Sequence, residues 1–394
     1  MSSSGSLERL ENLPLLRHVA TAGLRMTVHA PDGTSWNAGA APSLVAVRLR
    51  TADAIAALRT GDHLALAEAY LRGEIDVDGS WPELMRVTDL VSLTARPFDR
   101  LRLAGRLWLR NRQRYDRESI AFHYDRPAEF FLPWLDRWRC YSHGLYAHQG
   151  EPLENAIARK LQTAIDRLGL QSGMHVLDMG GGWGCFVEYA GRRGIHVHSI
   201  TISAAQHTFV EQLIQEHRLP CTSELVHLRD YRPARAFDGA VFMGTFEHNP
   251  EYDAVVTFLD RHLTPAARVW ADFCAQHTDF TIGAFMKKHI WPGSITYVDP
   301  ARLVQAFQRR RFNIHELRDD TLHYACTLRD WGAAFDAHAA VLSASFHEPA
   351  VRAFRLFLHG SLHFLETNRT QAYHLVAGRT PAPLPTGRGT VPPT

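Results

Sequence analysis

The chain has 394 residues, which is long enough for two or three domains of about 100–200 residues each. Its hydrophobic fraction of 45% allows a sizeable core, and its formal net charge of +2 argues against nucleic-acid binding over the whole surface. The five scattered cysteines form no Cys-x-x-Cys pair and suggest no metal site, as is typical of a reducing compartment. The start of the chain lacks the pattern of a signal peptide, and no run of about 18 apolar residues could span a membrane, so we expect a cytoplasmic protein.

Residues 1–90 are predicted to form a small amino-terminal α+β domain. Alternating apolar residues in Leu24–Ala30 and Leu44–Leu49 indicate strands. A helical pattern over Asp62–Arg72 precedes a short strand at Glu74–Val77. The expected role of this domain stays open between contact with lipid or substrate and contact with a second copy in a homodimer.

Residues 91–120 differ in composition from the rest of the chain. Eight arginines lie between Arg96 and Arg117, interleaved with aliphatic and aromatic residues. This pattern fits a basic amphipathic helix that rests peripherally on an anionic membrane. It fits equally a solvated linker helix with one face packed on the body of the protein.

Residues 121–378 are predicted to form an α/β catalytic domain. Apolar strands alternate with helical patterns over short links, which indicates a parallel sheet covered on both faces. The predicted elements are strands at His175–Met179, His196–Ile202, Phe237–Met243 and Arg268–Phe273, with helices that reach Arg192 and cover Ala204–His217. The tail at 379–394 contains five prolines and two glycines and is predicted to be disordered.

A glycine-rich loop, Gly180–Gly184, stands directly between a buried strand and a helix. Glycines in this place allow a sharp turn and a close approach to a ligand. A dinucleotide site would have Gly-x-Gly-x-x-Gly and an acid about 20 residues later, whereas here the acid, Asp178, precedes the glycines. No Lys-Ser/Thr follows for a phosphate loop. The pattern favours a ligand with a cationic amino-acid part and no phosphate, such as S-adenosylmethionine, over an ordinary strand–helix turn.

Several motifs in a fixed order resemble the cyclopropane fatty acid synthase family of class I S-adenosylmethionine-dependent methyltransferases. The resemblance runs from about residue 15 to residue 378. It implies a Rossmann-like sheet of seven strands with helical insertions. The motifs are Leu66–Gly79, Tyr141-Ser142-His143-Gly144, Leu177–Gly184, Thr201–Gln206, Asp230-Tyr231-Arg232, Gly244–His248 and Tyr324–Trp331.

The resemblance assigns the methionine end of the cofactor by position. It implies that Tyr141 and Ser142 close over the methionine part and that Gly180 and Gly182 line it from below. Asp178 belongs to the same motif.

The other end of the cofactor is assigned in the same way. Thr201 and Gln206 are expected at the ribose, and Asp230 or Tyr231 beside the adenine. The alternative is that Thr201 and Ser203 simply cap the helix that follows.

The reaction centre is expected around Glu247 and Tyr324. Glu247 follows a predicted strand, and residues at the carboxyl ends of strands face the site in open α/β sheets. The resemblance implies that this glutamate acts at the active centre and that Tyr324 lies near the substrate. Phe246, Trp291 and Tyr297 are candidates for aromatic walls that stabilise a carbocation. The alternatives are a solvated glutamate that caps a helix and aromatics that belong to the core.

The sequence departs from the family at two positions. Where the family carries a cysteine and a histidine that help to hold a bicarbonate base, this chain carries His143 and Asp272. A bound bicarbonate is therefore in doubt. An imidazole beside a carboxylate is itself a general-base pair, so we predict that His143, oriented by Asp272, replaces bicarbonate. Substitution at a site adapted to another substrate is the alternative.

Together these observations predict a C-methyltransferase that acts on an alkene through a carbocation. The product would be a cyclopropane or a methyl-branched chain, on a lipid acyl chain or a natural-product substrate. Two alternatives stay open, namely an N- or C-methyltransferase of a soluble small metabolite and a cofactor-binding partner without catalysis.

Overall fold

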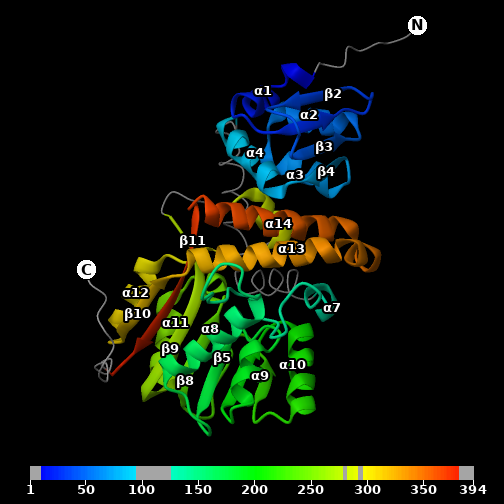
Figure 1. Cartoon of the computed structure of the whole chain (residues 1–394). Helices are drawn as coiled ribbons and strands as arrows, with labels where there is room; N and C mark the ends of the chain where they lie inside the picture. The colour runs from blue at the N-terminus through cyan, green and yellow to red at the C-terminus, as the bar shows by residue number, and fades with distance from the viewer. Residues whose placement is uncertain (1–9, 95–125, 278–281, 292–295, 381–394) are drawn as a thin grey trace.

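The computed structural model describes residues 10–94, 126–277, 282–291 and 296–380, which form two sheets and the helices around them (Figure 1). The basic segment predicted at 91–120 lies almost wholly outside the described residues, as does the tail beyond residue 380. Within the described ranges no helix is long and apolar enough to cross a membrane.

The amino-terminal unit is a four-stranded sheet, in the order β2-β1-β3-β4, with its helices. Strands β1 and β3 pair parallel, and the two outer pairs are antiparallel. The Asp62 side chain starts the helix α3 by accepting the Ala65 N–H at 2.8 Å, as an amino-terminal cap. The elements are η1 (Leu10–Asn12), α1 (Pro14–Thr21), β1 (Met26–His29), β2 (Ser35–Ala38), β3 (Val45–Leu49), α2 (Ala52–Thr60), α3 (His63–Leu71), β4 (Ile75–Gly79) and α4 (Trp81–Thr94).

The larger unit is a seven-stranded sheet in the order β10-β11-β9-β8-β5-β6-β7. Its first half contains α7 (Ala128–Phe131), α8 (Leu153–Leu168), β5 (His175–Met179), α9 (Cys185–Gly191), β6 (His196–Thr201), α10 (Ala204–His217), β7 (Thr222–Leu225) and β8 (Phe237–Met243). Its second half contains η2 (Phe246–His248), α11 (Tyr252–His262), β9 (Leu263–Gln276), η3 (Met286–Ile290), α12 (Pro300–Arg309), β10 (Asn313–Asp319), α13 (Thr321–Ser345), α14 (Glu348–Glu366) and β11 (Thr370–Gly378).

The sheet of seven strands is mostly parallel, as predicted, but it is antiparallel at one edge. Strands β7, β6, β5, β8 and β9 pair parallel, whereas β11 pairs antiparallel with both β9 and β10. Strand β11 is almost entirely buried between its neighbours. An apolar run of this kind carries no information on strand direction, because buried strands of either direction lack alternation.

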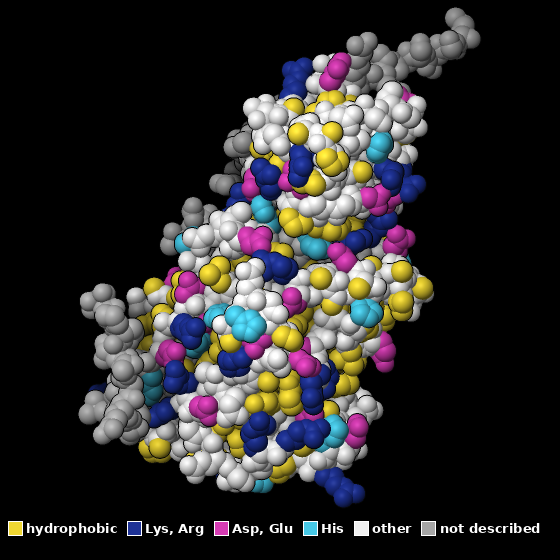
Figure 2. Space-filling model, viewed as in Figure 1, with side chains coloured by type: hydrophobic (Ala, Val, Ile, Leu, Met, Phe, Trp, Pro, Cys, Tyr) yellow, Lys and Arg dark blue, Asp and Glu magenta, His cyan; other side chains and the backbone are white. Residues whose placement is uncertain are grey.

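Helices α13 and α14 form an antiparallel hairpin between the two sheets (Figure 1). The amino-terminal unit rests on α14, where Arg352 donates to the Asp76 carboxylate at 2.8 Å and Trp81 stacks on His359 at 4.8 Å between ring centroids. On the face that Figure 2 shows, basic and acidic side chains are interspersed rather than gathered by sign, as the near-balanced net charge leads one to expect.

Candidate active site

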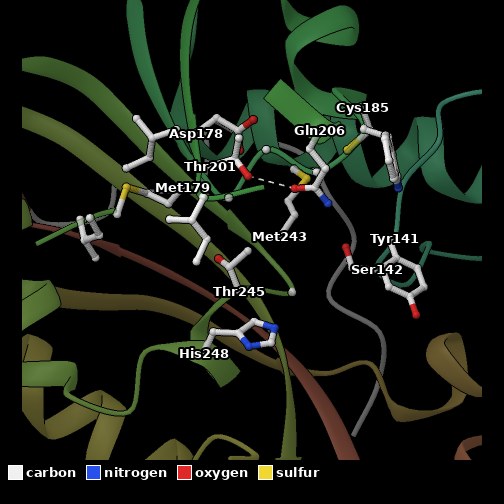
Figure 3. A pocket seen from close by; sticks show the side chains of 18 of the residues that line it. Tyr141, Ser142, Asp178, Met179, Cys185, Thr201, Gln206, Met243, Thr245 and His248 are labelled. Atoms are coloured by element: carbon white, nitrogen blue, oxygen red, sulfur yellow. Dashed lines mark hydrogen bonds between the residues drawn. The ribbon is translucent and has the colours of Figure 1, made fainter. Parts of the chain in front are cut away.

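A cavity opens at the carboxyl ends of β5, β6 and β8 (Figure 3). Asp178 is the penultimate residue of β5, which the glycine loop follows, while Thr201 ends β6 and Gln206 projects from α10. The segment Arg139–Ser142 closes another side of the cavity. The carboxyl ends of parallel strands are where open α/β sheets bind ligands, so the cavity lies where a cofactor is expected.

The glycine loop contains two kinds of position. A Cβ at Gly180 would meet Thr245 Cγ2 at 2.6 Å, and one at Gly181 would meet Ser199 Oγ at 1.9 Å. A Cβ at Gly182 would meet no described atom within 4 Å, although its φ of +53° favours glycine. The backbone at Gly180 and Gly181 is therefore packed against the protein, whereas Gly182 borders open space in the cavity.

Asp178 is buried at the floor of the cavity. Its Oδ2 accepts a hydrogen bond from Ser199 Oγ at 3.3 Å. Burial raises the pKa of this carboxyl to about 7, although the bond from Ser199 opposes the rise. A cationic group in the cavity would favour the ionised carboxylate, because opposite charges lower a carboxyl pKa.

The predicted ribose residues lie together in the cavity. Thr201 Oγ1 donates to Gln206 Oε1 at 3.0 Å (Figure 3). Ser203 caps α10 by accepting the Gln206 N–H at 3.3 Å. The capping role therefore falls to Ser203, and both Thr201 and Gln206 present side chains to the cavity.

The structure does not bring Asp230 or Tyr231 into this cavity. Their place is taken by the preceding segment, 226–228, which lines it. The Tyr231 ring instead stacks on His198 at 5.2 Å, and it borders a separate hollow against α11. The structure therefore does not support the prediction that Asp230 or Tyr231 flanks the adenine, since neither residue lines the cavity.

Tyr141 and Ser142 both line the cavity, as expected. The Tyr141 ring is held in an aromatic cluster, 5.6 Å from Trp134 and 5.4 Å from Trp331. Ser142 Oγ accepts a hydrogen bond from Lys160 Nζ at 2.6 Å. Both side chains are thus fixed from outside the cavity.

Asp272 pairs with Lys160, so the predicted pair of His143 with Asp272 is wrong. Asp272 Oδ2 lies 3.4 Å from Lys160 Nζ and accepts from Trp270 Nε1 at 3.2 Å. Both charged side chains are fully buried. Burial lowers the pKa of Lys160, but the interactions with Asp272, Cys140 and Cys185 together outweigh burial and leave that pKa above the ordinary lysine value. Asp272 is therefore engaged by Lys160 and not by His143.

His143 is buried and binds a different carboxylate. Its Nε2 lies 3.0 Å from Asp320 Oδ2, and His374 Nδ1 lies 2.5 Å from the same oxygen. Burial raises the pKa of Asp320, but the hydrogen bonds from the two imidazoles outweigh burial and hold it well below its ordinary value. His143 therefore forms a His–Asp pair, but its partner is Asp320 and not the predicted Asp272.

Glu247 is buried behind the cofactor cavity. Its Oε1 accepts the Cys274 N–H at 2.7 Å, and Oε2 has no hydrogen-bond partner among the described residues. Burial raises the pKa of Glu247 to about 7. Burial also raises the pKa of Tyr324, and the charges of Cys274 and Glu247 add to the rise, so these three groups lie close together. Cys274 was not predicted, because a single cysteine in a strand carries no signal.

Of the other aromatic candidates, Tyr297 lies near Glu247, whereas Phe246 and Trp291 pack against other aromatic rings. Tyr297 lies near Glu247 and Cys274, since their charges raise its pKa further above the value that burial gives it. Phe246 is fully buried in the core, 4.4 Å from the Phe242 ring, so it forms no wall of the site. Trp291 packs edge-on against Phe357 of α14 at 4.9 Å.

This sheet order and this cavity are those of a class I S-adenosylmethionine-dependent methyltransferase. The model of the family described as mycolic acid cyclopropane synthetase matches residues 111–375. The chain belongs to that family, and it is an S-adenosylmethionine-dependent methyltransferase.

Relatives match over most of the chain. It is 26% identical to a probable fatty acid methyltransferase of Mycobacterium tuberculosis, over 95% of either chain. It is 28% identical to the cyclopropane-fatty-acyl-phospholipid synthase of Escherichia coli K12, over 86% of this chain and 89% of that one. A solved mycolic acid cyclopropane synthase, complexed with SAH and CTAB, has the same fold, with a TM-score of 0.62 and 22% identity over 66% of this chain and 97% of its own.

The described residues fit S-adenosylmethionine but not a bicarbonate base. The cavity offers a buried carboxylate, Asp178, and open space over Gly182 for a cationic ligand without phosphate. His143 and Asp272, the two positions that differ from the family, provide no free positive charge or hydrogen-bond donor for an anion. Asp272 is a carboxylate already neutralised by Lys160, and the Nε2 of His143 is engaged by Asp320. A second anion beside these carboxylates would be repelled.

Proposed function

We propose that the protein methylates an alkene carbon of a lipid acyl chain. The observation that supports this most is the buried Glu247, which has one carboxyl oxygen without a partner among the described residues and lies beside Tyr324 and Tyr297. Related proteins named for fatty-acyl phospholipid and fatty acid substrates support the same acceptor class. An apolar acyl chain also suits a centre in which Glu247 is buried and Tyr324 and Tyr297 are half-buried.

The residues act mainly by positioning and electrostatics. Bound S-adenosylmethionine supplies an activated methyl group on a sulfonium. The site then has to align the alkene with this methyl group and exclude water, because alignment and preorganised charge lower the barrier of such a transfer. Glu247, when ionised, and the rings of Tyr324 and Tyr297 can stabilise the cation that the alkene becomes.

The acceptor and the product are tested together. Cells that express the protein are grown with methyl-labelled methionine, and their lipids are analysed by mass spectrometry. We expect labelled acyl chains heavier by one methylene unit, either cyclopropane or methyl-branched. Glu247→Gln serves as the control that should lack them. Label found only in small soluble metabolites would contradict the proposed acceptor.

We also propose that residues 1–90 form a separate accessory domain, because they have a sheet of their own.

We further propose that the protein works in the cytoplasm and contacts the inner face of the membrane. The arginines of residues 91–120 support this contact. A basic residue near an anionic surface contributes about 1 kcal/mol, which salt removes. Flotation with anionic and neutral vesicles tests the contact, and equal recovery with both would refute it.

A further inference from the structure

The buried Asp320 fixes the proton of His143 on one nitrogen. An ionised carboxylate only accepts hydrogen bonds, so His143 Nε2 and His374 Nδ1 both donate to Asp320 Oδ2, at 3.0 and 2.5 Å. Neutral His143 then carries its proton on Nε2 and has its lone pair on Nδ1. Within the described part of the chain, no hydrogen bond is formed to Nδ1.

His143 lies at the reaction centre and not in a distant part of the core. It follows Ser142, which lines the cofactor cavity. Its ring centroid is 5.1 Å from that of Tyr324, which lies against Cys274 and Glu247. The unprotonated Nδ1 therefore belongs to an imidazole beside the aromatic wall of the proposed carbocation.

The same Asp320 oxygen, Oδ2, is also bound by His374, whose ring is packed in place. The His374 ring stacks on Trp270 at 4.5 Å between centroids, and the two rings are 12° from parallel. His374 Nε2 is 3.3 Å from Glu316 Oε1. A carboxylate fixed in this way can both orient His143 and stabilise the imidazolium that forms when it takes a proton.

We propose that His143 is the built-in general base of this methyltransferase, with Asp320 and His374 as its positioning residues. This inference rests on the proposed function, since it assigns the proton-transfer step of that reaction. The alkene π pair forms a bond to the methyl carbon of S-adenosylmethionine, and the carbon–sulfur bond breaks with its electrons on sulfur. His143 Nδ1 then takes one proton from the cation.

The position of the lost proton decides the product. If it leaves the transferred methyl group, the C–H electron pair closes a cyclopropane. If it leaves the neighbouring carbon, the pair forms the double bond of a methyl-branched alkene. Either route yields S-adenosylhomocysteine and an imidazolium at His143, which returns its proton to water when the product leaves.

The test uses His143→Gln, since a glutamine amide can still donate to Asp320 but has no basic nitrogen. With unsaturated phospholipid vesicles and methyl-labelled S-adenosylmethionine, we expect kcat to fall by on the order of 10²–10⁴. The matched control is His359→Gln, whose parent imidazole lies 3.1 Å from Asp336 between α13 and α14. Its kcat should stay within about threefold of the wild type.

Asp320→Asn separates positioning from packing. The amide can donate to His143 Nε2 and move the proton onto Nδ1, so we expect a loss that approaches 10⁴, on the order known for a wrong tautomer. Cofactor affinity, measured by calorimetry, should be unchanged in both variants. The acidic limb of the pH profile, where a general base becomes protonated and activity is lost, should move in Asp320→Asn. The charged and titratable groups that face this imidazole are Asp320, His323, Tyr324, His374 and Arg318.

The outcomes are distinguishable. If the wild type labels no acyl chain, the proposed function fails. If the wild type is active and His143→Gln stays within about threefold of it, with bound cofactor and an intact fold, the base is not His143. Stimulation of the wild type by added bicarbonate would overturn the inference in the same way.

Discussion

The buried pair of Lys160 and Asp272 should stabilise both the fold and the cofactor cavity. In Lys160→Met, Asp272 would remain fully buried with only the Trp270 N–H at 3.2 Å, and its Oδ1 already has no hydrogen-bond partner among the described residues. Removal of one partner from a buried ion pair costs roughly 3–5 kcal/mol. Ser142 would lose the donor at 2.6 Å that fixes it in the cavity wall. We therefore expect the variant to lose stability and to bind S-adenosylmethionine more weakly.

The assay is urea unfolding followed by tryptophan fluorescence, with calorimetry for the cofactor. The double variant Lys160→Met/Asp272→Leu should regain most of the lost stability, because it leaves no unpaired charge in the core. Lys288→Met is the matched control. It breaks an ion pair with Glu68 in which the lysine side chain is 58% exposed, so the cost should be at most about 1 kcal/mol. Equal losses in Lys160→Met and Lys288→Met would refute the reasoning.

Three further predictions concern the cofactor cavity and the neighbouring Glu247. Gly182→Val should abolish cofactor binding and also strain the backbone, because the φ of +53° at this position favours glycine. Gly181→Ala should lower the melting temperature, since its Cβ would meet Ser199 Oγ at 1.9 Å; calorimetry and thermal melts would check both variants. Cofactor affinity should rise as the pH increases from about 6 to 8, as the buried Asp178 with its pKa of about 7 ionises, and Asp178→Asn should flatten that dependence. The raised pKa also means that Asp178 keeps its proton in the folded state above its unfolded pKa, so without cofactor it lowers stability as the pH rises from about 4 to 7. Glu247→Gln should lower kcat by on the order of 10²–10⁴ and leave cofactor affinity unchanged, because Glu247 lies outside the cofactor cavity; single-turnover kinetics would check this.

Local patterns predicted the elements that carry the cofactor. Strands His175–Met179 and Phe237–Met243 and helix Ala204–His217 have the predicted bounds, since each is an apolar run or amphipathic stretch between clear breaks. The carboxyl ends of β5 and β6 bring Asp178 and Thr201 to one cavity. The α13–α14 hairpin and the reversed strand β11 were not predicted, because pairing direction and the long excursion before β11 depend on tertiary contacts.

Contacts between residues that lie far apart in the chain could not be predicted from the sequence. His143 and Asp320 are 177 positions apart, and nothing local distinguishes Asp320 from its neighbour Asp319. Lys160 belongs to the amphipathic helix α8, where a lysine ordinarily reaches solvent, yet it is fully buried. The resemblance to the family implied that positions 143 and 272 both differ from it. Only the fold shows that His143 pairs with Asp320 and that Asp272 pairs with Lys160.

Because His143 pairs with Asp320 and Asp272 pairs with Lys160, we can predict the effect of restoring the family residues at positions 143 and 272. His143→Cys with Asp272→His restores the family residues and removes one carboxylate, which leaves Lys160 as a buried cation beside Ser142 and Cys140. A bicarbonate anion could then compensate that charge, whereas in the wild type Asp272 already does so. We expect the double variant to be nearly inactive in degassed buffer and to gain activity with added bicarbonate, measured as labelled acyl product. The matched control is Asp272→His alone, in which His143 keeps its bond to Asp320 at 3.0 Å and the base is still present, so its activity should not depend on bicarbonate. If the double variant shows no response to bicarbonate while it still binds cofactor, the charge of Asp272 is not what excludes the anion.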